Sequence, residues 1–142
     1  MHKIRILILD AQGGGMGAMV AKKIRTRLPD AELMAVGTNC TATENMKNAG
    51  IKAVASGENS VVVCSSRADI IIAPLGMVVA NSMMGEVTAR MAEAVSSSQA
   101  KRILIPFFSC DNIIVGVKDI GLSSLVDDAV EKAVEISRAL CG

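Results

Sequence analysis

Short runs of apolar residues alternate along the chain with segments whose apolar positions recur every three or four residues. The runs are typical of strands buried on both faces, and the spaced segments are typical of helices with one buried face. Strands are predicted at residues 3–9, 32–36, 51–55, 68–73 and 101–106. Helices are predicted at residues 16–28, 41–48, 58–66, 83–97 and 124–140. This alternation predicts a mainly parallel sheet between two layers of helices.

The end of the sheet departs from the parallel pattern. Only residues 107–112 separate the fifth strand from a β-branched run at 113–117. A parallel crossover needs about a dozen residues, so a strand at 113–117 is expected to be antiparallel. Right-handed crossovers favour the order 3-2-1-4-5, with a flavodoxin-like order as the alternative. We therefore expect one α/β domain over residues 1–142. Its fold is three-layer and Rossmann-like, with a mainly parallel sheet, a final antiparallel strand and a C-terminal helix.

Local signals mark the ends and faces of three helices. Thr41–Glu44 has the spacing of a capping box for the second helix, and Ser124–Asp127 has the same spacing before the last one. In the helix at 83–97, Met84 belongs to an apolar face, whereas Glu86 and Arg90 are four residues apart. The last two residues are therefore expected to form an ion pair on the exposed surface.

The loops that follow strands are richer in glycine, amide and hydroxyl groups than the loops that follow helices. In such a sheet, ligands bind outside the carboxyl ends of the strands. A glycine-rich loop follows the first strand and opens a helix, where backbone N–H groups and the helix dipole favour a phosphate. The candidate binding residues are Asp10, Gln12, Gly13, Gly14, Gly15, Met16, Gly17, Thr38, Asn39, Gly76, Asn81 and Ser82.

Two spacings compete within the glycine-rich loop. Gly13-x-Gly15-x-x-Ala18 fits the dinucleotide fingerprint with a final Ala. Ala11-x-x-x-Gly15-x-Gly17 fits the spacing of short-chain dehydrogenases, except that Ala11 replaces its first glycine. The alternative to both is a tight turn between strand and helix that binds no ligand.

The end of the second strand bears on the cofactor. An NAD site usually has Asp or Glu there to bind the ribose hydroxyls, but this chain has Gly37, Thr38 and Asn39. Standard NAD binding is therefore disfavoured, and NADP or another nucleotide stays open. Thr38 and Asn39 have the groups to bond a ribose or a 2′-phosphate, and they equally suit a turn that leads into the next helix.

Composition excludes several functions. The formal net charge is +1 and aromatic residues make up 1%, which disfavours nucleic acid as a partner. The chain has no Tyr, the general acid of short-chain dehydrogenases, and a single His. The four cysteines form no metal-binding spacing, so no metal is expected, and reduced thiols fit the cytoplasm. The longest apolar run, at 70–80, is too short to span a membrane, so no membrane contact is expected.

Candidate catalytic groups are few, and each has a structural explanation. Cys40 and Cys110 are expected at the ligand-binding edge, without a His nearby to activate them. Asp10 has the chemistry to bind a metal or a ribose, and equally to accept hydrogen bonds from loop amides. Glu58 is explained by its place at a helix start, and Glu86 by its expected pairing with Arg90. Whether the protein is an enzyme is left open by these residues.

Several blocks of the sequence resemble a small bacterial family known as a domain of unknown function. They are the loop at 10–17, Gly37-Thr38-Asn39, Gly57-Glu58-Asn59, Pro74-Leu75-Gly76, Ala80-Asn81-Ser82-Met83 and Gly85-Glu86-Val87-Thr88. The resemblance covers nearly the whole chain. It implies a Rossmann-like domain and names no substrate or activity. Ala11 stands where the family usually has Gly, which weakens the short-chain-dehydrogenase spacing.

The function expected from the sequence is binding of a nucleotide or another small phosphate ligand. One alternative is a small NADP-type oxidoreductase completed in a homo-oligomer, with the apolar residues 76–80 forming part of the contact. Another alternative is a non-catalytic regulatory or partner-binding protein in which the glycines only make the turn.

Overall fold

A computed structural model describes residues 2–107, 112–117 and 119–142. Five parallel strands form one sheet in the order β3-β2-β1-β4-β5. The strands are β1 (Arg5–Asp10), β2 (Glu32–Gly37), β3 (Ala53–Ser56), β4 (Ile70–Pro74) and β5 (Lys101–Ile105). The predicted α/β class and the strand order 3-2-1-4-5 are confirmed.

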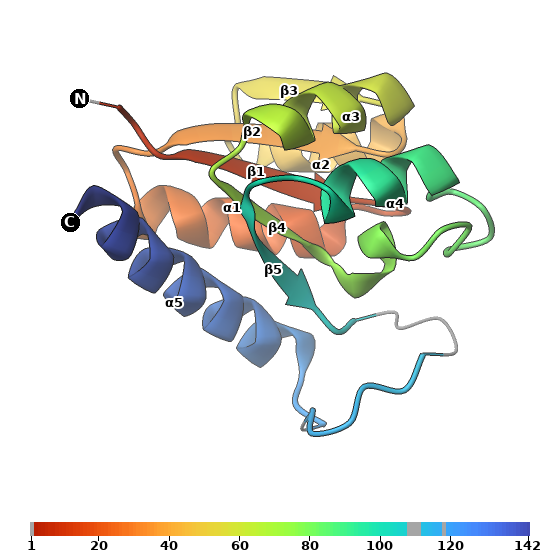
Figure 1. Ribbon diagram of the computed structural model, residues 1–142. Coiled ribbons are helices and arrows are strands. Elements are labelled where there is room, and N and C mark those ends of the chain that lie inside the picture. The colour runs from red at the N-terminus through yellow and green to blue at the C-terminus, as the bar shows by residue number, and fades with distance from the viewer. Residues whose placement is uncertain (1, 108–111, 118) are drawn as a thin grey trace.

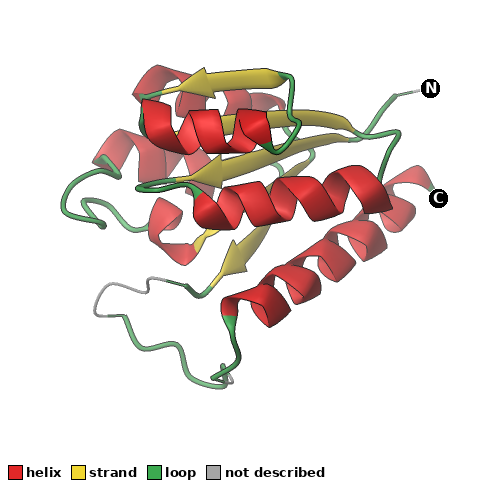
Figure 2. Ribbon diagram, turned by 180° about the vertical axis from the view of Figure 1, so that it is seen from behind, coloured by secondary structure: helices red, strands yellow, loops and turns green. Residues whose placement is uncertain are grey.

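Helices cover both faces of the sheet (Figures 1 and 2). They are α1 (Gly15–Arg27), α2 (Cys40–Asn48), α3 (Glu58–Arg67), α4 (Ala89–Ser96) and α5 (Leu122–Cys141), with a short 3₁₀ helix η1 (Leu75–Val78) after β4. Residues of α1, α2 and α5 pack on one face of the sheet, and residues of α3 and α4 pack on the other. None of the helices in the described ranges is long and apolar enough to cross a membrane.

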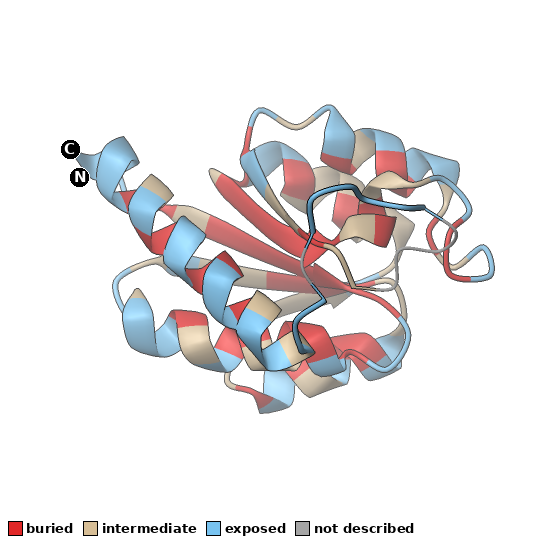
Figure 3. Ribbon diagram, turned by 90° about the horizontal axis from the view of Figure 1, so that it is seen from below, coloured by how far each residue is buried: buried red, intermediate tan, exposed pale blue. Residues whose placement is uncertain are grey.

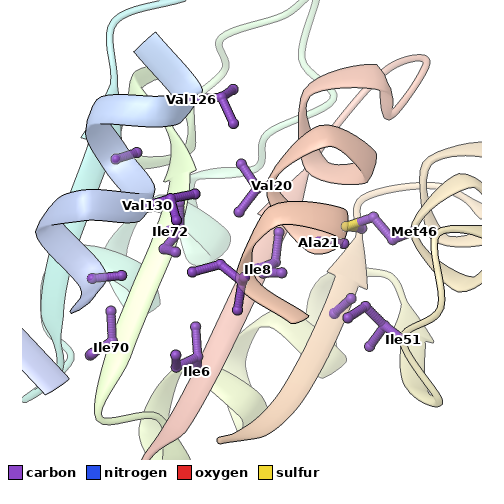
Figure 4. Packing of buried hydrophobic residues seen from close by; sticks show 14 of the residues in the cluster. Ile6, Ile8, Val20, Ala21, Met46, Ile51, Ile70, Ile72, Val126 and Val130 are labelled. Carbon is purple, nitrogen blue, oxygen red and sulfur yellow. The ribbon is translucent and has the colours of Figure 1, made fainter. Parts of the chain in front are cut away.

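Strand β1 is the central strand of the sheet. Because its successive side chains point to opposite faces, it contributes to the hydrophobic core on both sides of the sheet. Ile6 and Ile8 pack with the first group of helices, and Leu7 and Leu9 pack with the second. All four are fully buried, which explains why β1 is an unbroken apolar run. In Figure 4, Ile8 of β1 is drawn among residues of the first cluster, with Val20 of α1 and Ile72 of β4 nearby. The core thereby fixes the end of β1, from which the glycine-rich loop begins.

The predicted antiparallel strand at residues 113–117 is wrong. Ile113 and Val115 are 91% and 89% exposed, and the segment forms an open loop with a turn at residues 115–116 (Figure 3). The reason is the path of the chain, because α5 begins at the edge of the sheet where β5 ends (Figure 1). A strand running back along β5 would carry the chain to the opposite edge. All strands among the described residues are parallel.

Two predicted helix starts are also corrected. The helix predicted at 83–97 begins only at Ala89, because Met83 and Met84 have φ angles of 56° and 59°, outside the right-handed helical region. Met84 is consequently fully exposed rather than on a buried face. The last helix begins at Leu122, so Ser124 lies within α5 instead of capping it.

Candidate functional site

The glycine-rich loop between β1 and α1 is closed by the side chain of Asp10. One carboxylate oxygen, Oδ1, accepts a hydrogen bond of 2.8 Å from the N–H of Ala11, and Oδ2 accepts one of 2.6 Å from the N–H of Gly17. Asp10 is buried, and burial raises the pKa of its carboxyl above the usual range despite these two bonds. Asp10 therefore shapes the loop by accepting hydrogen bonds from loop amides, which is one of the two roles that the sequence suggested for it.

Gly17 is required by the same contact. A Cβ atom at Gly17 would lie 2.9 Å from Oδ2 of Asp10 and 2.7 Å from the sulfur of Met46. Gly14 is required for a different reason, because its φ is +74° and a Cβ atom there would lie 2.6 Å from Cα of Ala42. These two glycines serve the packing of the loop. Met16 is buried in the core, so its side chain contributes no binding group.

Gly13 and Gly15 have open space where a side chain would be. An ideal Cβ atom at either position meets no atom of the described residues within 4 Å. These positions are therefore free of the packing demands that fix Gly14 and Gly17. Their lack of side chains leaves the backbone of the loop accessible from outside.

The backbone N–H groups of the loop divide into engaged and unengaged sets. Gly14 donates to the carbonyl of Ala11 at 3.1 Å, Gln12 donates to a carboxylate described below, and Gly17 donates to Asp10. Among the described residues, no acceptor is found for the N–H groups of Gly13, Gly15 and Met16. The last two belong to the first turn of α1, where the partial positive charge of the helix dipole is greatest.

Glu86 brings the loop after β1 and the end of β2 together. Its Oε1 atom accepts hydrogen bonds from the N–H of Gln12, at 2.6 Å, from the hydroxyl of Thr38 and from the side-chain amide of Asn39. The predicted ion pair between Glu86 and Arg90 is wrong. Nη1 of Arg90 instead lies 3.6 Å from Oε1 of Glu58.

The ionisation of Glu86 follows from these bonds. Partial burial opposes the charged form, but the hydrogen bonds from Thr38, Gln12 and Asn39 outweigh it and lower the pKa of Glu86. Glu86 is therefore a carboxylate at neutral pH. A fixed negative charge thus lies at the end of β2, beside the glycine-rich loop, where the sequence predicted no carboxylate.

Sequence reasoning missed Glu86 because a turn of unusual conformation presents it. Asn81, Met83 and Met84 have positive φ angles of 64°, 56° and 59°, and Gly85 follows with φ 85°. Left-handed conformations are uncommon for residues other than glycine. Asn81 and Gly85 are residue types that favour such angles, but Met83 and Met84 are not, and the contact with Gln12 spans 74 positions.

Asn39 is placed to link three elements. Its Oδ1 accepts a hydrogen bond of 2.8 Å from the N–H of Ala42 and caps α2, whereas its Nδ2 donates to the carbonyl of Gln12 at 3.0 Å and to Glu86. The predicted capping box at Thr41 is therefore wrong by two residues, because the side chain of Asn39 fills that role. The polar groups of Thr38 and Asn39 are thus engaged within the protein.

Gly76, Asn81 and Ser82 do not contact the glycine-rich loop by any hydrogen bond within the described part of the chain. The hydroxyl of Ser82 donates to the carbonyl of Gly76 at 2.6 Å, and a Cβ atom at Gly76 would lie 2.6 Å from the terminal carbon of Met83. Both residues stabilise the turn that carries Glu86. The side chain of Asn81 is exposed.

Other candidate chemistry lies apart from these groups. Cys40 is an exposed free thiol at the start of α2, and Cys110 lies outside the described residues. Over residues 2–107, 112–117 and 119–142, no group of three or more His, Cys, Asp or Glu side chains is arranged to hold a metal ion. A groove of about 440 Å³ lies between α1 and α5, away from the strand ends, and it contains the ion pairs Lys23–Asp127 and Arg27–Glu131.

Comparison with solved structures identifies proteins of similar architecture. Wzb from Vibrio vulnificus, solved in complex with benzylphosphonate, aligns with a TM-score of 0.54 at 13% identity, over 94% of this chain and 99% of that one. TubZ of the Clostridium botulinum phage c-st aligns with a TM-score of 0.36 at 11% identity, over 96% of this chain and 48% of that one. At this identity, the likeness to Wzb shows a shared α/β fold.

Sequence comparison places the chain in a family. No curated protein matches the sequence. The family described as "Domain of unknown function (DUF3842)" matches residues 5–138, which include all five strands and nearly all of α5. The resemblance seen in the sequence is thereby confirmed, and the chain belongs to the DUF3842 family.

Proposed function

We propose that this protein binds a small phosphate ligand, such as a nucleotide, at the start of α1. The observation that carries the proposal is that the N–H groups of Gly13, just before α1, and of Gly15 and Met16, in the first turn of this 13-residue helix, have no acceptor among the described residues. Backbone N–H groups and the helix dipole together favour an anion at such a place.

The surrounding loop supports this function in two ways. Asp10 holds both ends of the loop through hydrogen bonds of 2.8 and 2.6 Å, so the donors are held in place before any ligand arrives. Gly13 and Gly15 leave space for a ligand to approach the backbone. Wzb, which shares the fold, is described with a bound phosphonate, and a phosphate ligand here is compatible with that.

The chemistry of the loop favours binding over phosphoryl transfer. Residues 10–17 include no Cys, Ser, Thr, Lys, Arg or His. Its one candidate nucleophile, the carboxylate of Asp10, is buried and already accepts bonds from the N–H groups of Ala11 and Gly17. The loop therefore supplies backbone donors but no free side-chain nucleophile and no cation for phosphate chemistry. Binding of the ligand, rather than its cleavage, is the activity that these residues support.

Gly15→Asp tests the proposal. Asp at the first position of α1 is favourable for the helix but repels an anion from the unengaged N–H groups. We expect inorganic phosphate to shift the amide NMR signals of Gly13, residue 15 and Met16 in the wild type, with at least a tenfold loss of affinity in the variant. The free energy of unfolding should be unchanged or higher by up to about 1 kcal/mol.

Gly121→Asp is the matched control for that experiment. Gly121 precedes α5, and a Cβ atom there also meets nothing within 4 Å in the part of the chain that the structure describes. This variant adds the same charge to the start of another helix, so phosphate binding should be unchanged. If phosphate causes no shift in the loop of the wild type, or if both variants bind it equally, the proposal is wrong.

A second candidate function, self-association, is favoured by a different observation. Ile113, Val115 and Val117 are exposed after β5, and exposed apolar residues that lie together mark interaction surfaces. Residues 76–80 serve this purpose less well than the sequence suggested, because Gly76 and Met77 are buried. We therefore propose a homo-oligomer that uses residues 113–117.

A cytoplasmic location stays a prediction from the sequence.

A further inference from the structure

We propose that Glu86 makes the site selective for nucleotides whose ribose carries free 2′ and 3′ hydroxyls, and selective against nucleotides with a 2′-phosphate. This inference rests on the proposed function, because it concerns the sugar attached to the phosphate bound at α1. It assigns to Glu86 the recognition of a vicinal diol.

The position of Glu86 carries the first step. In a sheet of this order, the sugar next to a phosphate bound at the first loop lies toward the end of β2, where an acidic side chain commonly receives the ribose hydroxyls. The end of β2 has Thr38 and Asn39 instead, and both of their side chains donate to Glu86. A carboxylate is thus present in space at the end of β2, although a different loop supplies it.

The second step is that the two carboxylate oxygens of Glu86 differ in their hydrogen bonds. Oε1 accepts the bonds from Gln12, Thr38 and Asn39. Oε2 accepts no hydrogen bond from the residues that the structure describes, and the side chain is only half-buried. One oxygen therefore fixes the carboxylate in place, and the other keeps the capacity to accept bonds from two adjacent hydroxyls.

The third step is charge. A 2′-phosphate carries up to two negative charges and would lie close to the carboxylate of Glu86. Repulsion between the 2′-phosphate and this carboxylate would oppose binding, and it would be stronger where water is partly excluded. No Lys or Arg among the described residues forms an ion pair with Glu86. The fixed negative charge thus reverses the preference expected from the sequence, which left NADP open and disfavoured NAD.

The test compares ADP-ribose with 2′-phospho-ADP-ribose by isothermal titration calorimetry. The wild type should bind ADP-ribose at least tenfold more tightly. In Glu86→Gln, an amide oxygen remains to accept the bonds from Gln12, Thr38 and Asn39, while the charge is lost. The preference should fall at least fivefold in this variant, mainly through tighter binding of the 2′-phosphate.

Glu32→Gln is the matched control. Glu32 is an exposed residue at the start of β2, at the opposite edge of the sheet, and it loses the same charge. This variant should keep the wild-type preference. Equal binding of the two ligands by the wild type, a preference for the 2′-phosphate, or an unchanged ratio in Glu86→Gln would each overturn the inference.

Inorganic phosphate separates failure of this inference from failure of the proposed function. Phosphate has no sugar, so its effect on the amide signals of Gly13 and Gly15 is expected whatever Glu86 does with a ribose. If phosphate binds but the two nucleotides do not differ, only the role of Glu86 is wrong. If neither phosphate nor either nucleotide binds, both proposals fall.

Discussion

The backbone N–H of Gln12 donates a hydrogen bond of 2.6 Å to Oε1 of Glu86, which lies 74 positions further along the chain. This bond joins the loop after β1 to the turn before α4 and satisfies one N–H at the edge of the glycine-rich loop. The N–H groups of Gly13, Gly15 and Met16 are left without an acceptor among the described residues. A half-buried carboxylate thus lies next to the loop that carries these donors, an arrangement suited to the proposed ligand with both a phosphate and hydroxyl groups.

Replacing Glu86 with Ala should loosen the glycine-rich loop more than it destabilises the protein. The variant leaves Gln12, Thr38 and Asn39 without their common acceptor. Because these groups are partly exposed, water replaces much of the interaction, and we expect a loss of about 1 kcal/mol in the free energy of unfolding. Hydrogen exchange of the Gln12 amide should accelerate at least tenfold. Unchanged exchange at Gln12 would show that the bond does not hold the loop in solution.

The two kinds of glycine in the loop should respond in opposite directions to Ala. Within a helix, Ala is normally favoured over Gly by about 1 kcal/mol. At Gly17, however, the new Cβ atom would overlap Asp10 and Met46, so the free energy of unfolding should fall by about 1–3 kcal/mol. At Gly13, where space is open, it should be unchanged or rise by up to about 1 kcal/mol. Urea denaturation measures both, and equal effects would contradict the described loop.

The two carboxyl groups of the site should titrate on opposite sides of their ordinary values. Burial raises the pKa of Asp10 above 3.8, whereas hydrogen bonds lower that of Glu86 below 4.5. The contribution of Asp10 to stability is therefore present below about pH 3.8 and is lost as the pH rises through its folded pKa. The contribution of Glu86 is present above about pH 4.5 and is lost as the pH falls through its folded pKa. Carboxyl ¹³C NMR titration measures both values.

Glu86→Gln tests whether the charge of Glu86 affects the pKa of Asp10. The charge of Glu86 is one of the factors that raise the pKa of Asp10. Removing that charge should lower the pKa of Asp10, whereas Glu32→Gln, at the far end of β2, should leave it unchanged. A rise in the pKa of Asp10 in Glu86→Gln would contradict the proximity of the two groups.

The sheet could be predicted from the sequence because its central strands are buried on both faces. Side chains such as Ile8 and Ile72 are fully buried whichever face of the sheet they point to, so these strands appear in the sequence as unbroken apolar runs. The run at 113–117 has the same residue types and forms no strand. The residue types do not show where α5 begins. The path of residues 113–117 depends on that position, because these residues connect β5 to α5.

The candidate site was predicted in part. The loop at 10–17 was found from glycine spacing, because the backbone conformation of a tight strand–helix turn is a local property of the sequence. Glu86 was assigned to a helix surface, since Met84 and Val87 have helical spacing with Met91. Left-handed angles at Met83 and Met84 break that helix, and the turn that follows brings Glu86 to the N–H of Gln12, 74 positions earlier in the chain. A contact of this range leaves no periodic pattern to read.

Ile113 and Val115 should contribute to association and not to the stability of the fold. Their side chains are 91% and 89% exposed, so replacing both with Ser removes no core packing and should change the free energy of unfolding by less than about 0.5 kcal/mol. If residues 113–117 join two copies, light scattering of the wild type should show an oligomer that the double variant loses. Leu140→Ser, which alters an apolar residue 49% exposed near the end of α5, should leave the oligomer intact. A monomeric wild type, or equal masses for all three proteins, would show that association does not use this segment.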